Sequence, residues 1–350
     1  MRLLKLALRN LFRNLRRTLI TMAAIASGLA LVLVMVAMQA GSYKEMLASG
    51  ISSFAGHVVV QAEGWQEERE TEQVVLGATE VSEKLKAAFP DATVTSRAFL
   101  GGLLTSPTSS GGVMLRGVDP VAEAAVDRLD DRIVEGTWLE AGDDRGVVLG
   151  RGLADALGVG LGDKVVYMGQ AAGQTEMSSR LFRVKGIFRT GGAEMDGTMA
   201  VTSLAATQEL LGRPDAVHQV ALHLVNPRES AAATTSVRAL VGEPGLAVLE
   251  WPQALPELVA FIRVDKVSGD VMMAVMGLIV AMGVLNTLLM SVLERTKEFG
   301  VLMSIGMAPH RLGGLILMES LFLGIFGSLF GVLFGAILVW LLVVYGLDYT

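Results

Sequence analysis

The chain has 350 residues and a formal net charge of −6; 52% of its residues are hydrophobic and only 18% are charged. This composition is too apolar for an ordinary soluble globular protein and favours a membrane protein. Because cysteine is absent, disulfide bonds and cysteine-based metal sites are excluded.

The first 17 residues predict an amphipathic helix. Leucine and phenylalanine share one helical face and cations occupy the opposite face, which is typical of a helix lying in a membrane interface beside anionic headgroups. The alternative is a positive topology signal without such a helix. The cations are Arg2, Lys5, Arg9, Arg13, Arg16 and Arg17, of which we assign Arg9, Arg13, Arg16 and Arg17 to the membrane interface.

No charge occurs between Arg17 and Lys44, between Asp270 and Glu294, or between Glu319 and Asp348. Each stretch is long enough to cross a bilayer, since about 20 apolar residues span about 30 Å of hydrocarbon. We place these transmembrane spans at residues 18–40, 271–293 and 315–345. The alternative for the first span is a cleaved signal peptide, but its apolar run exceeds the usual length and no small-residue cleavage site stands out. Positively charged flanks stay in the cytoplasm, so the N-terminus is expected inside.

This orientation makes residues 41–270 an exported domain, returns residues 294–314 to the cytoplasm and leaves residues 346–350 outside. Residues 41–269 carry 20 basic and 30 acidic side chains, a net charge of −10, which agrees with export. The domain is large enough for one large or two small globular units.

Two lobes are predicted within the exported domain. The strand, helix, strand order of residues 57–105 recurs in residues 217–251, which favours one α/β lobe built from both segments. Residues 111–200 contain short apolar runs and many glycines, and they predict an inserted β-rich lobe with a short helix near Leu153. The polar run of residues 63–73 predicts a mobile loop.

No catalytic, cofactor or metal site is predicted. The glycine-rich residues 150–162 have no following Lys-Ser/Thr, which excludes a phosphate-binding loop. The histidines are scattered, and His218 and His223 should point to opposite faces of one strand. A zinc site is the disfavoured alternative.

A charged, glycine-punctuated segment follows the second span. We expect a short amphipathic helix at the cytoplasmic surface, ended by the "APHR" sequence (308–311), with an exposed apolar strip formed by Phe299, Leu302 and Ile305. A plain connecting turn is the alternative, but it would need fewer residues. The candidate partner-binding residues are Glu294, Arg295, Lys297, Glu298, Phe299, Gly300, Leu302, Ile305 and Gly306.

The third span carries a stripe of small residues and one acid. Gly324, Gly327, Gly331 and Gly335 fall on one face, where they would let another helix approach closely. Glu319 is an intramembrane acid that we expect to reach water or a neighbouring arginine. A proton-coupled carrier is disfavoured because the spans hold no second acid or histidine.

Several of these motifs together resemble the FtsX-like and MacB-like permeases of ABC transporters, and among them the LolC/LolE lipoprotein-releasing subunits. The matching segments are "LALRNLFRNLRRTLIT", "ERTKEFGVLMSIGM", "VMLRGVDP" and "GRGLADALGVGLGDKV", with Glu319 and the glycines of the third span. The resemblance implies an α-helical membrane protein with a large α+β exported domain, made of a ferredoxin-like porter lobe and an inserted β-rich lobe.

The resemblance also implies partners and a location. A separate ATPase would bind ATP and Mg²⁺, so this chain would be no enzyme and would bind no cofactor. The segment from Glu294 to Gly306 would be the coupling helix seated on that ATPase. A second permease subunit would complete a dimer in the bacterial inner membrane, with a periplasmic carrier or adaptor as a further partner and no nucleic acid. The family pattern has a fourth span that residues 1–350 do not contain; we expect it after Thr350, and the alternative is that it is supplied otherwise.

Three functions fit this resemblance. Lipoprotein release from the inner membrane is the preferred one, and export of a peptide, lipid or antibiotic by a MacB-like complex is the alternative within transport. The third is an FtsX-like signalling permease that activates a cell-wall hydrolase, which the size of the exported domain disfavours.

Overall fold

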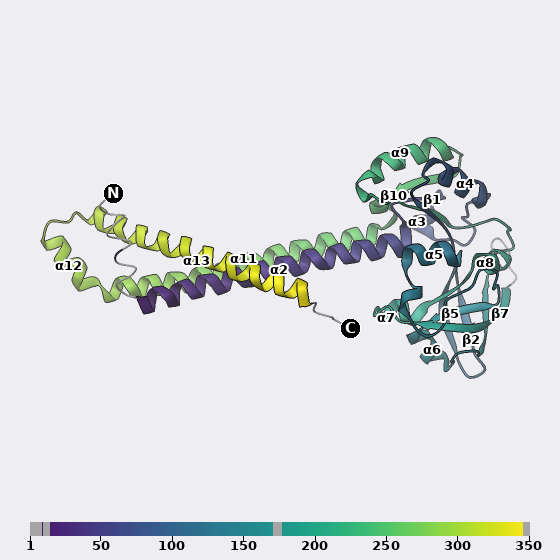
Figure 1. Cartoon of the computed structure of the whole chain (residues 1–350), viewed down its shortest axis with the longest axis horizontal. Helices are drawn as coiled ribbons and strands as arrows, with labels where there is room; N and C mark the ends of the chain where they lie inside the picture. Colours follow the sequence, from purple (N-terminus) through teal and green to yellow (C-terminus); the bar gives the residue numbers. More distant parts are fainter. Residues whose placement is uncertain (1–8, 10–14, 171–176, 346–350) are drawn as a thin grey trace. The chain divides into compact units, whose positions relative to one another are not determined.

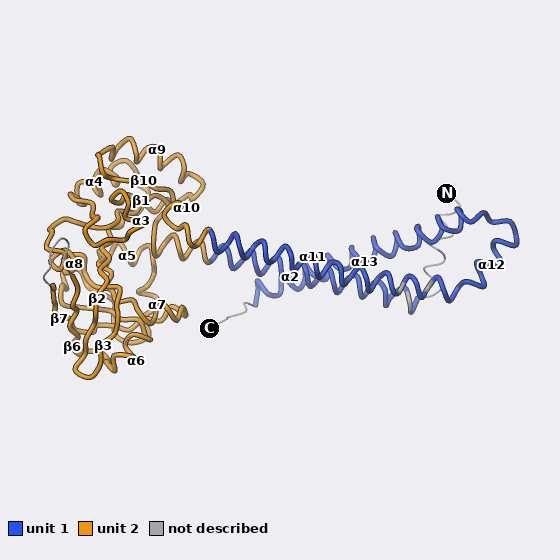
Figure 2. Tube along the Cα trace, turned by 180° about the vertical axis from the view of Figure 1, so that it is seen from behind, with its two compact units in different colours: residues 1–45, 260–350 blue, residues 46–259 orange. Residues whose placement is uncertain are grey.

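The computed structural model describes residues 9, 15–170 and 177–345, and it divides into two compact units (Figure 2). Unit 1 comprises residues 1–45 and 260–350, and unit 2 comprises residues 46–259. The predicted interfacial helix at residues 1–17 falls largely outside the described residues.

Long helices dominate unit 1. They are α2 (Leu15–Gly50), α11 (Pro256–Glu294) and α13 (Pro309–Tyr345), with the short α12 (Thr296–Ser304) between the last two (Figure 1). By length and composition, Thr18–Ala55, Pro256–Glu294 and Pro309–Tyr345 could each cross a membrane. Both α2 and α11 are longer than the spans expected from hydropathy, because their additional turns are polar and a hydropathy pattern does not count them.

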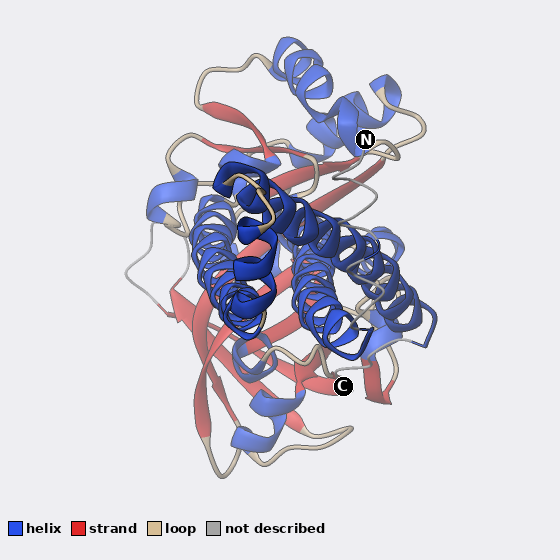
Figure 3. Cartoon of the chain, turned by 90° about the vertical axis from the view of Figure 1, so that its left-hand side faces the viewer, coloured by secondary structure: helices blue, strands red, loops and turns tan. Residues whose placement is uncertain are grey.

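All ten strands in the described part of the chain belong to unit 2, where they form one hydrogen-bonded sheet (red in Figure 3). The strands are β1 (Val58–Ala62), β2 (Thr93–Thr105), β3 (Ser110–Val118), β4 (Ile133–Gly136), β5 (Gly146–Gly150), β6 (Lys164–Gln170), β7 (Met177–Phe188), β8 (Met199–Ser203), β9 (Gln219–His223) and β10 (Leu246–Glu250).

The helical segments of unit 2 are mostly short. They are the π-helix η1 (Ile51–Ala55), α3 (Trp65–Glu68), α4 (Ala78–Ala88), α5 (Pro120–Asp127), η2 (Asp130–Arg132), α6 (Arg151–Leu157), α7 (Ala193–Thr198), α8 (Leu204–Leu211), η3 (Pro227–Glu229), α9 (Ser230–Val241) and α10 (Trp251–Ala254). The helix expected near Leu153 is α6, and Gly158 ends it in the left-handed conformation that suits glycine.

One end of the sheet has the strand order β10-β1-β9-β2, and every neighbouring pair there is antiparallel. The chain passes β1, α4, β2 and later β9, α9, β10, so its two strand-helix-strand runs interleave in a split βαβ arrangement. Valine and leucine side chains of these strands pack with α4 and α9 into one buried cluster that includes Val60, Leu85, Val220 and Val237.

The other end of the sheet closes on itself. β2 pairs with β3 and with β6, while β3-β8-β5-β7-β6 completes the ring of neighbours. Closure removes free strand edges, and side chains fill the interior of so small a ring. The largest buried cluster lies here and includes Leu100, Leu115, Leu149, Tyr167 and Phe182.

The expectation of a mobile loop at residues 63–73 was wrong for its first part. Trp65 opens the short helix α3 and is buried, with its ring centroid 5.7 Å from that of Phe99 and 5.8 Å from that of His218. One large aromatic side chain anchors a segment that otherwise shows no apolar periodicity.

The buried His218 makes the stability of unit 2 dependent on pH. Burial lowers the pKa of His218 to about 4, and its Nδ1 accepts a hydrogen bond from the Phe99 N–H at 3.0 Å. In the unfolded chain His218 takes up a proton as the pH falls through about 6.5, whereas in the folded chain it stays neutral until the pH approaches 4. The contribution of neutral His218 to the unfolding free energy is therefore complete above pH 6.5 and is lost as the pH falls towards 4.

We therefore expect His218→Gln, which keeps an acceptor, to reduce the acid-dependent loss of unfolding free energy by about 3 kcal/mol. Urea unfolding of the full chain in detergent at pH 7.5 and pH 4 measures this difference. The same acid-dependent loss in wild type and variant would contradict the assignment.

Candidate functional site

The short helix α12 lies between α11 and α13 in the segment that the sequence marked as a partner-binding candidate. Its C-terminus has the glycine-capped geometry in which the Gly306 N–H donates to the Met303 carbonyl and the Met307 N–H donates to the Leu302 carbonyl, both at 3.0 Å. Gly306 has φ +101°, a conformation that side chains disfavour, so this position requires glycine.

The end of this segment differs from the prediction. The "APHR" residues do not close α12, because α12 ends at Ser304 and α13 already begins at Pro309. Proline suits the first turn of a helix, where its missing N–H has no helical partner. The predicted third span therefore has a helical extension of six residues before Leu315.

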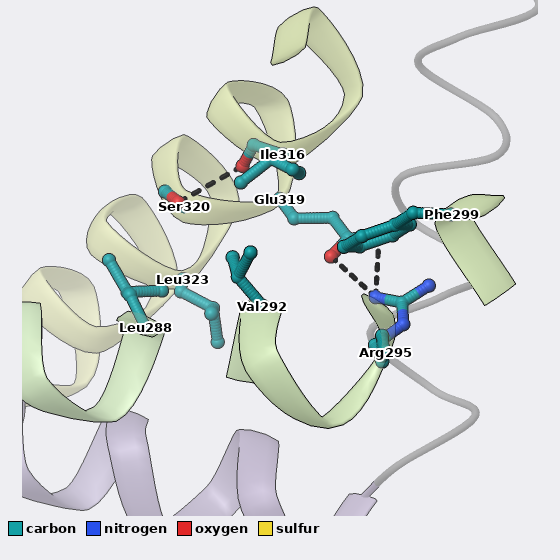
Figure 4. Close-up of a pocket in the computed structure, with 8 residues that line it drawn as sticks. All are labelled: Leu288, Val292, Arg295, Phe299, Ile316, Glu319, Ser320 and Leu323. Carbon is teal, nitrogen blue, oxygen red and sulfur yellow. Dashed lines mark hydrogen bonds and ion pairs between the residues drawn. The ribbon is translucent and has the colours of Figure 1, made fainter. Parts of the chain in front are cut away.

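An ion pair joins the start of α12 to α13. The Arg295 Nη1 donates to Oε2 of Glu319 at 3.0 Å and to Oε1 at 3.3 Å, and each residue's side chain is 12% exposed. The Arg295 guanidinium also lies 5.3 Å from the centroid of the Phe299 ring (Figure 4). Its Nε donates to Glu298 at 3.1 Å. Arg295 is thus the neighbouring arginine that Glu319 was expected to reach.

Apolar side chains from α11 and α13 surround this pair. The cavity that they enclose has a volume of ≈ 10 Å³, which holds at most one water molecule. The cluster therefore leaves no room for a small molecule, and its side chains pack α11, the start of α12 and α13 together. The lining residues drawn in Figure 4 are Leu288, Val292, Arg295, Phe299, Ile316, Glu319, Ser320 and Leu323.

The apolar strip predicted on α12 was wrong for two of its three residues. Phe299 is only 6% exposed because its ring covers Arg295, and Leu302 is half-buried. Ile305, the third predicted member, is 78% exposed as expected, and the other exposed apolar residues are Val301, at 57%, and Met303. A spacing of three residues could not reveal that an ion pair turns Phe299 inward.

The remaining candidate residues of this segment lie at its surface. Glu294 is the last residue of α11, while Lys297 and Gly300 belong to α12, and all three are exposed. The segment thus combines a rigid attachment to α13 through Arg295 with an outer surface that mixes charged and apolar side chains.

Three of the four predicted packing glycines bring α13 against α2. A Cβ added at Gly331 would lie 3.0 Å from the Ala26 Cα, and Gly327 and Gly335 meet α2 at comparable distances. Gly324 is the exception, because a Cβ added there would meet nothing within 4 Å. The contact therefore begins one turn later than the glycine spacing predicted.

Gly331→Ala and Gly324→Ala form a matched pair of tests. The first should cost about 1–3 kcal/mol of stability because the methyl group overpacks a backbone contact, whereas the second should cost nothing and can gain about 1 kcal/mol of helix propensity. Thermal unfolding of each variant in the same detergent measures the difference. Equal melting temperatures would contradict the close contact of α13 with α2.

A polar contact that the sequence did not indicate joins α2 to α11. The Tyr43 hydroxyl donates to Asp265 at 2.6 Å, and the Gln39 Nε2 donates to the Tyr43 hydroxyl at 2.8 Å. A Cβ added at Gly269 would lie 2.5 Å from the Gln39 amide nitrogen. No local signal could have paired these residues, since they are separated by more than 200 positions in the sequence.

The N-terminal cations are described only in part. Arg9 and Arg16 are exposed. Arg13 and the side chain of Arg17 lie outside the described residues.

Comparison with known proteins gives matches over most of the chain. Residues 18–240 match the family described as MacB-like periplasmic core domain, and residues 271–349 match the FtsX-like permease C-terminal family. The lipoprotein-releasing system transmembrane protein LolC of Neisseria meningitidis serogroup B is 25% identical over 329 residues, 92% of this chain and 77% of that protein. LolC of Xylella fastidiosa is 26% identical over 340 residues, 94% and 78% of the two chains.

Solved structures give weaker matches. The periplasmic region of MacB from Actinobacillus actinomycetemcomitans aligns with a TM-score of 0.43 at 16% identity, covering 59% of this chain and 95% of that one. The extracellular domain of the transporter YknZ from Gram-positive bacteria aligns with a TM-score of 0.40 at 13% identity, covering 55% and 99%.

Proposed function

Since the chain belongs to the MacB-like periplasmic core domain family and carries an FtsX-like permease C-terminal region, we propose that this ABC transporter permease passes ATP-driven motion from a separate ATPase to its exported domain. The preferred task is release of lipoproteins from the bacterial inner membrane. The extent of similarity to LolC, over 92% of this chain, supports this choice of cargo.

The coupling role rests chiefly on one observation. α12 is joined to α13 by the largely buried pair of Arg295 and Glu319, while Val301 in α12 and Ile305 at its C-terminal end are exposed. An exposed apolar surface on a rigidly held helix suits a protein partner, and force applied there reaches α11 and α13 directly.

The same proposal covers topology and partners. The cations of residues 1–17 support a cytoplasmic N-terminus, which places α12 in the cytoplasm beside the ATPase and unit 2 in the periplasm. ATP and Mg²⁺ would bind the ATPase, and this chain would bind no cofactor. A second permease subunit would complete the dimer, and a periplasmic carrier would accept the lipoprotein.

The proposed lobes follow the two halves of the sheet. The β10-β1-β9-β2 half, with α4 and α9, supports a ferredoxin-like porter lobe. The ring of strands closed by β6 supports the inserted β-rich lobe.

Reconstitution tests the proposed function. The chain is purified with its co-purifying ATPase, placed in proteoliposomes, and supplied with a fluorescent triacylated lipopeptide. We expect ATP-dependent release of the lipopeptide from the complex and no ATP hydrolysis by the isolated chain. ATP-dependent activation of a cell-wall hydrolase without lipopeptide release would replace transport with signalling.

A further inference from the structure

The end of helix α2 has an unusual local structure within unit 2. α2 ends at Gly50, and the π-helix η1 follows over Ile51–Ala55. The Gly56 N–H donates to the Ile51 carbonyl at 2.6 Å, while the next N–H, that of His57, donates to Leu222 of the sheet instead. Carbonyl groups in the last turn of a helix need partners from elsewhere in the protein.

Two arginines from the sheet supply these partners. Arg97 of β2 donates from Nη2 to the Ser52 carbonyl at 2.5 Å, and Arg116 of β3 donates from Nη1 to the Ser53 carbonyl at 2.9 Å. Both arginine side chains are fully buried. Phe99 of β2 pairs directly with Arg116, so Arg97 and Arg116 are diagonal neighbours on one face of the sheet.

Helix α5 supplies the opposite charges. Glu123 Oε1 accepts from Arg97 Nη2 at 2.8 Å and from Arg116 Nη2 at 2.6 Å, and Asp127, one helical turn later, accepts from Arg116 Nη2 at 2.5 Å. The Ser53 hydroxyl of η1 donates to the Asp127 carboxylate. Two cations and two anions thus form a buried network that balances its own charge.

The carboxylate of Asp127 is ionised at neutral pH. Burial alone would raise the pKa of Asp127, but the Arg116 guanidinium and the Ser53 hydroxyl outweigh it and lower that pKa below its ordinary value. A buried ion pair of this kind costs desolvation and adds little net stability, so the cluster calls for an explanation other than stability.

The position of Arg97 suggests that explanation. Arg97 pairs with Gln219 of β9 on one side of β2 and with Val118 of β3 on the other. It is therefore the residue at which β2 passes from the split βαβ half of the sheet into the closed ring. A group attached to Arg97 is attached to both halves.

We propose that Arg97 and Arg116 form the mechanical joint through which movement of α2 is passed to the sheet of the exported domain, with Glu123 and Asp127 as positioning residues. This inference rests on the proposed function. The π-helical turn presents the Ser52 and Ser53 carbonyls, the two guanidinium groups bind them, and α5 holds the guanidinium groups in place.

The double variant Arg116→Met with Asp127→Leu separates this role from stability. It removes one cation and one anion together, keeps the pair of Arg97 and Glu123, and deletes the donor to the Ser53 carbonyl. Replacing a buried ion pair with apolar side chains is often neutral for stability. The matched control, Arg151→Met with Glu135→Leu, removes an ion pair that is more exposed and does not involve η1.

Two readouts are taken on the full chain in complex with its ATPase. Amide hydrogen exchange in residues 46–57 should become about tenfold faster in the Arg116/Asp127 variant, corresponding to the loss of a hydrogen bond from a charged donor, and should not change in the control. ATP hydrolysis should stay at the wild-type rate while lipopeptide release per ATP falls about tenfold. Should the double variant fail to fold, Arg116→Lys, which keeps the charge but lacks the forked donor, should show both effects in weaker form.

The possible results test the proposed joint and the proposed transport function separately. Unchanged exchange in residues 46–57 would overturn the binding of η1 by Arg116, and faster exchange with normal release would overturn its role as a joint. A wild-type complex that releases no lipopeptide would instead refute the proposed function, while hydrogen exchange would still decide whether Arg116 holds the end of α2.

Discussion

Replacing Arg295 with leucine is expected to lower the unfolding free energy of the chain by about 3–5 kcal/mol and to abolish coupling to ATP hydrolysis. The substitution removes the guanidinium that donates to both carboxylate oxygens of Glu319, whose side chain is only 12% exposed. It also removes the cation that lies against the Phe299 ring within α12 itself, so α12 loses its ion pair with α13 and a contact that helps to place Phe299.

Two further variants test whether these losses arise from the ion pair of Arg295 and Glu319. The double variant Arg295→Met with Glu319→Leu removes the cation and the largely buried anion together and should recover most of the stability, but not the coupling. Arg311→Leu removes an exposed arginine near the start of α13 and should change neither quantity. Thermal unfolding in detergent and ATP-dependent lipopeptide release measure the two effects. A stable, fully coupled Arg295→Leu variant would contradict the structural role of the pair.

Replacing Val301 and Ile305 with aspartate is expected to weaken binding of the ATPase without disturbing the fold. Their side chains are 57% and 78% exposed, and a spacing of four residues places them on one side of the helix end. Apolar residues at the centre of a protein interface contribute about 2–4 kcal/mol each when they are hot spots, so each substitution should raise the Kd by roughly 30-fold or more.

The control for this experiment is Ile305→Met, which keeps an apolar side chain of similar size at the same place. It should bind the ATPase with nearly the wild-type Kd, as measured by titration of the labelled ATPase into the detergent-solubilised permease. An unaltered Kd in both aspartate variants would show that the ATPase does not bind this surface.

The sequence predicted those features that depend on local patterns. Charge-free runs indicated three spans, and the structure has a long apolar helix at each of them. The strand, helix, strand order of residues 57–105 and 217–251 indicated one helix in each segment, and the structure has these helices at Ala78–Ala88 and Ser230–Val241. Glu319 was recognised as an acid in need of a partner because the hydrophobic run around it holds no other charge.

Features that depend on contacts between distant residues could not be predicted. Closure of the ring requires β6 to pair with β2, and these strands are about 60 residues apart. The segment "VMLRGVDP" was noted as a family resemblance, yet nothing in it indicates that Arg116 is fully buried and donates to the Ser53 carbonyl. Phe299 was assigned to the surface for the same reason, since the ion pair beside its ring joins Arg295 to Glu319, which is 24 residues away in the sequence.

Accessibility of position 305 tests the central claim most directly. The natural chain has no cysteine, so Ile305→Cys introduces a single reactive thiol, and Val225→Cys, at an 81% exposed residue of unit 2, provides the opposite control. A membrane-impermeant maleimide is applied to inside-out vesicles and to cells with a permeabilised outer membrane. We predict that the thiol introduced at position 305 reacts in the vesicles and not in the cells, and that bound ATPase slows this reaction. The thiol introduced at position 225 should react only in the cells. Labelling of position 305 from the periplasm would contradict the account.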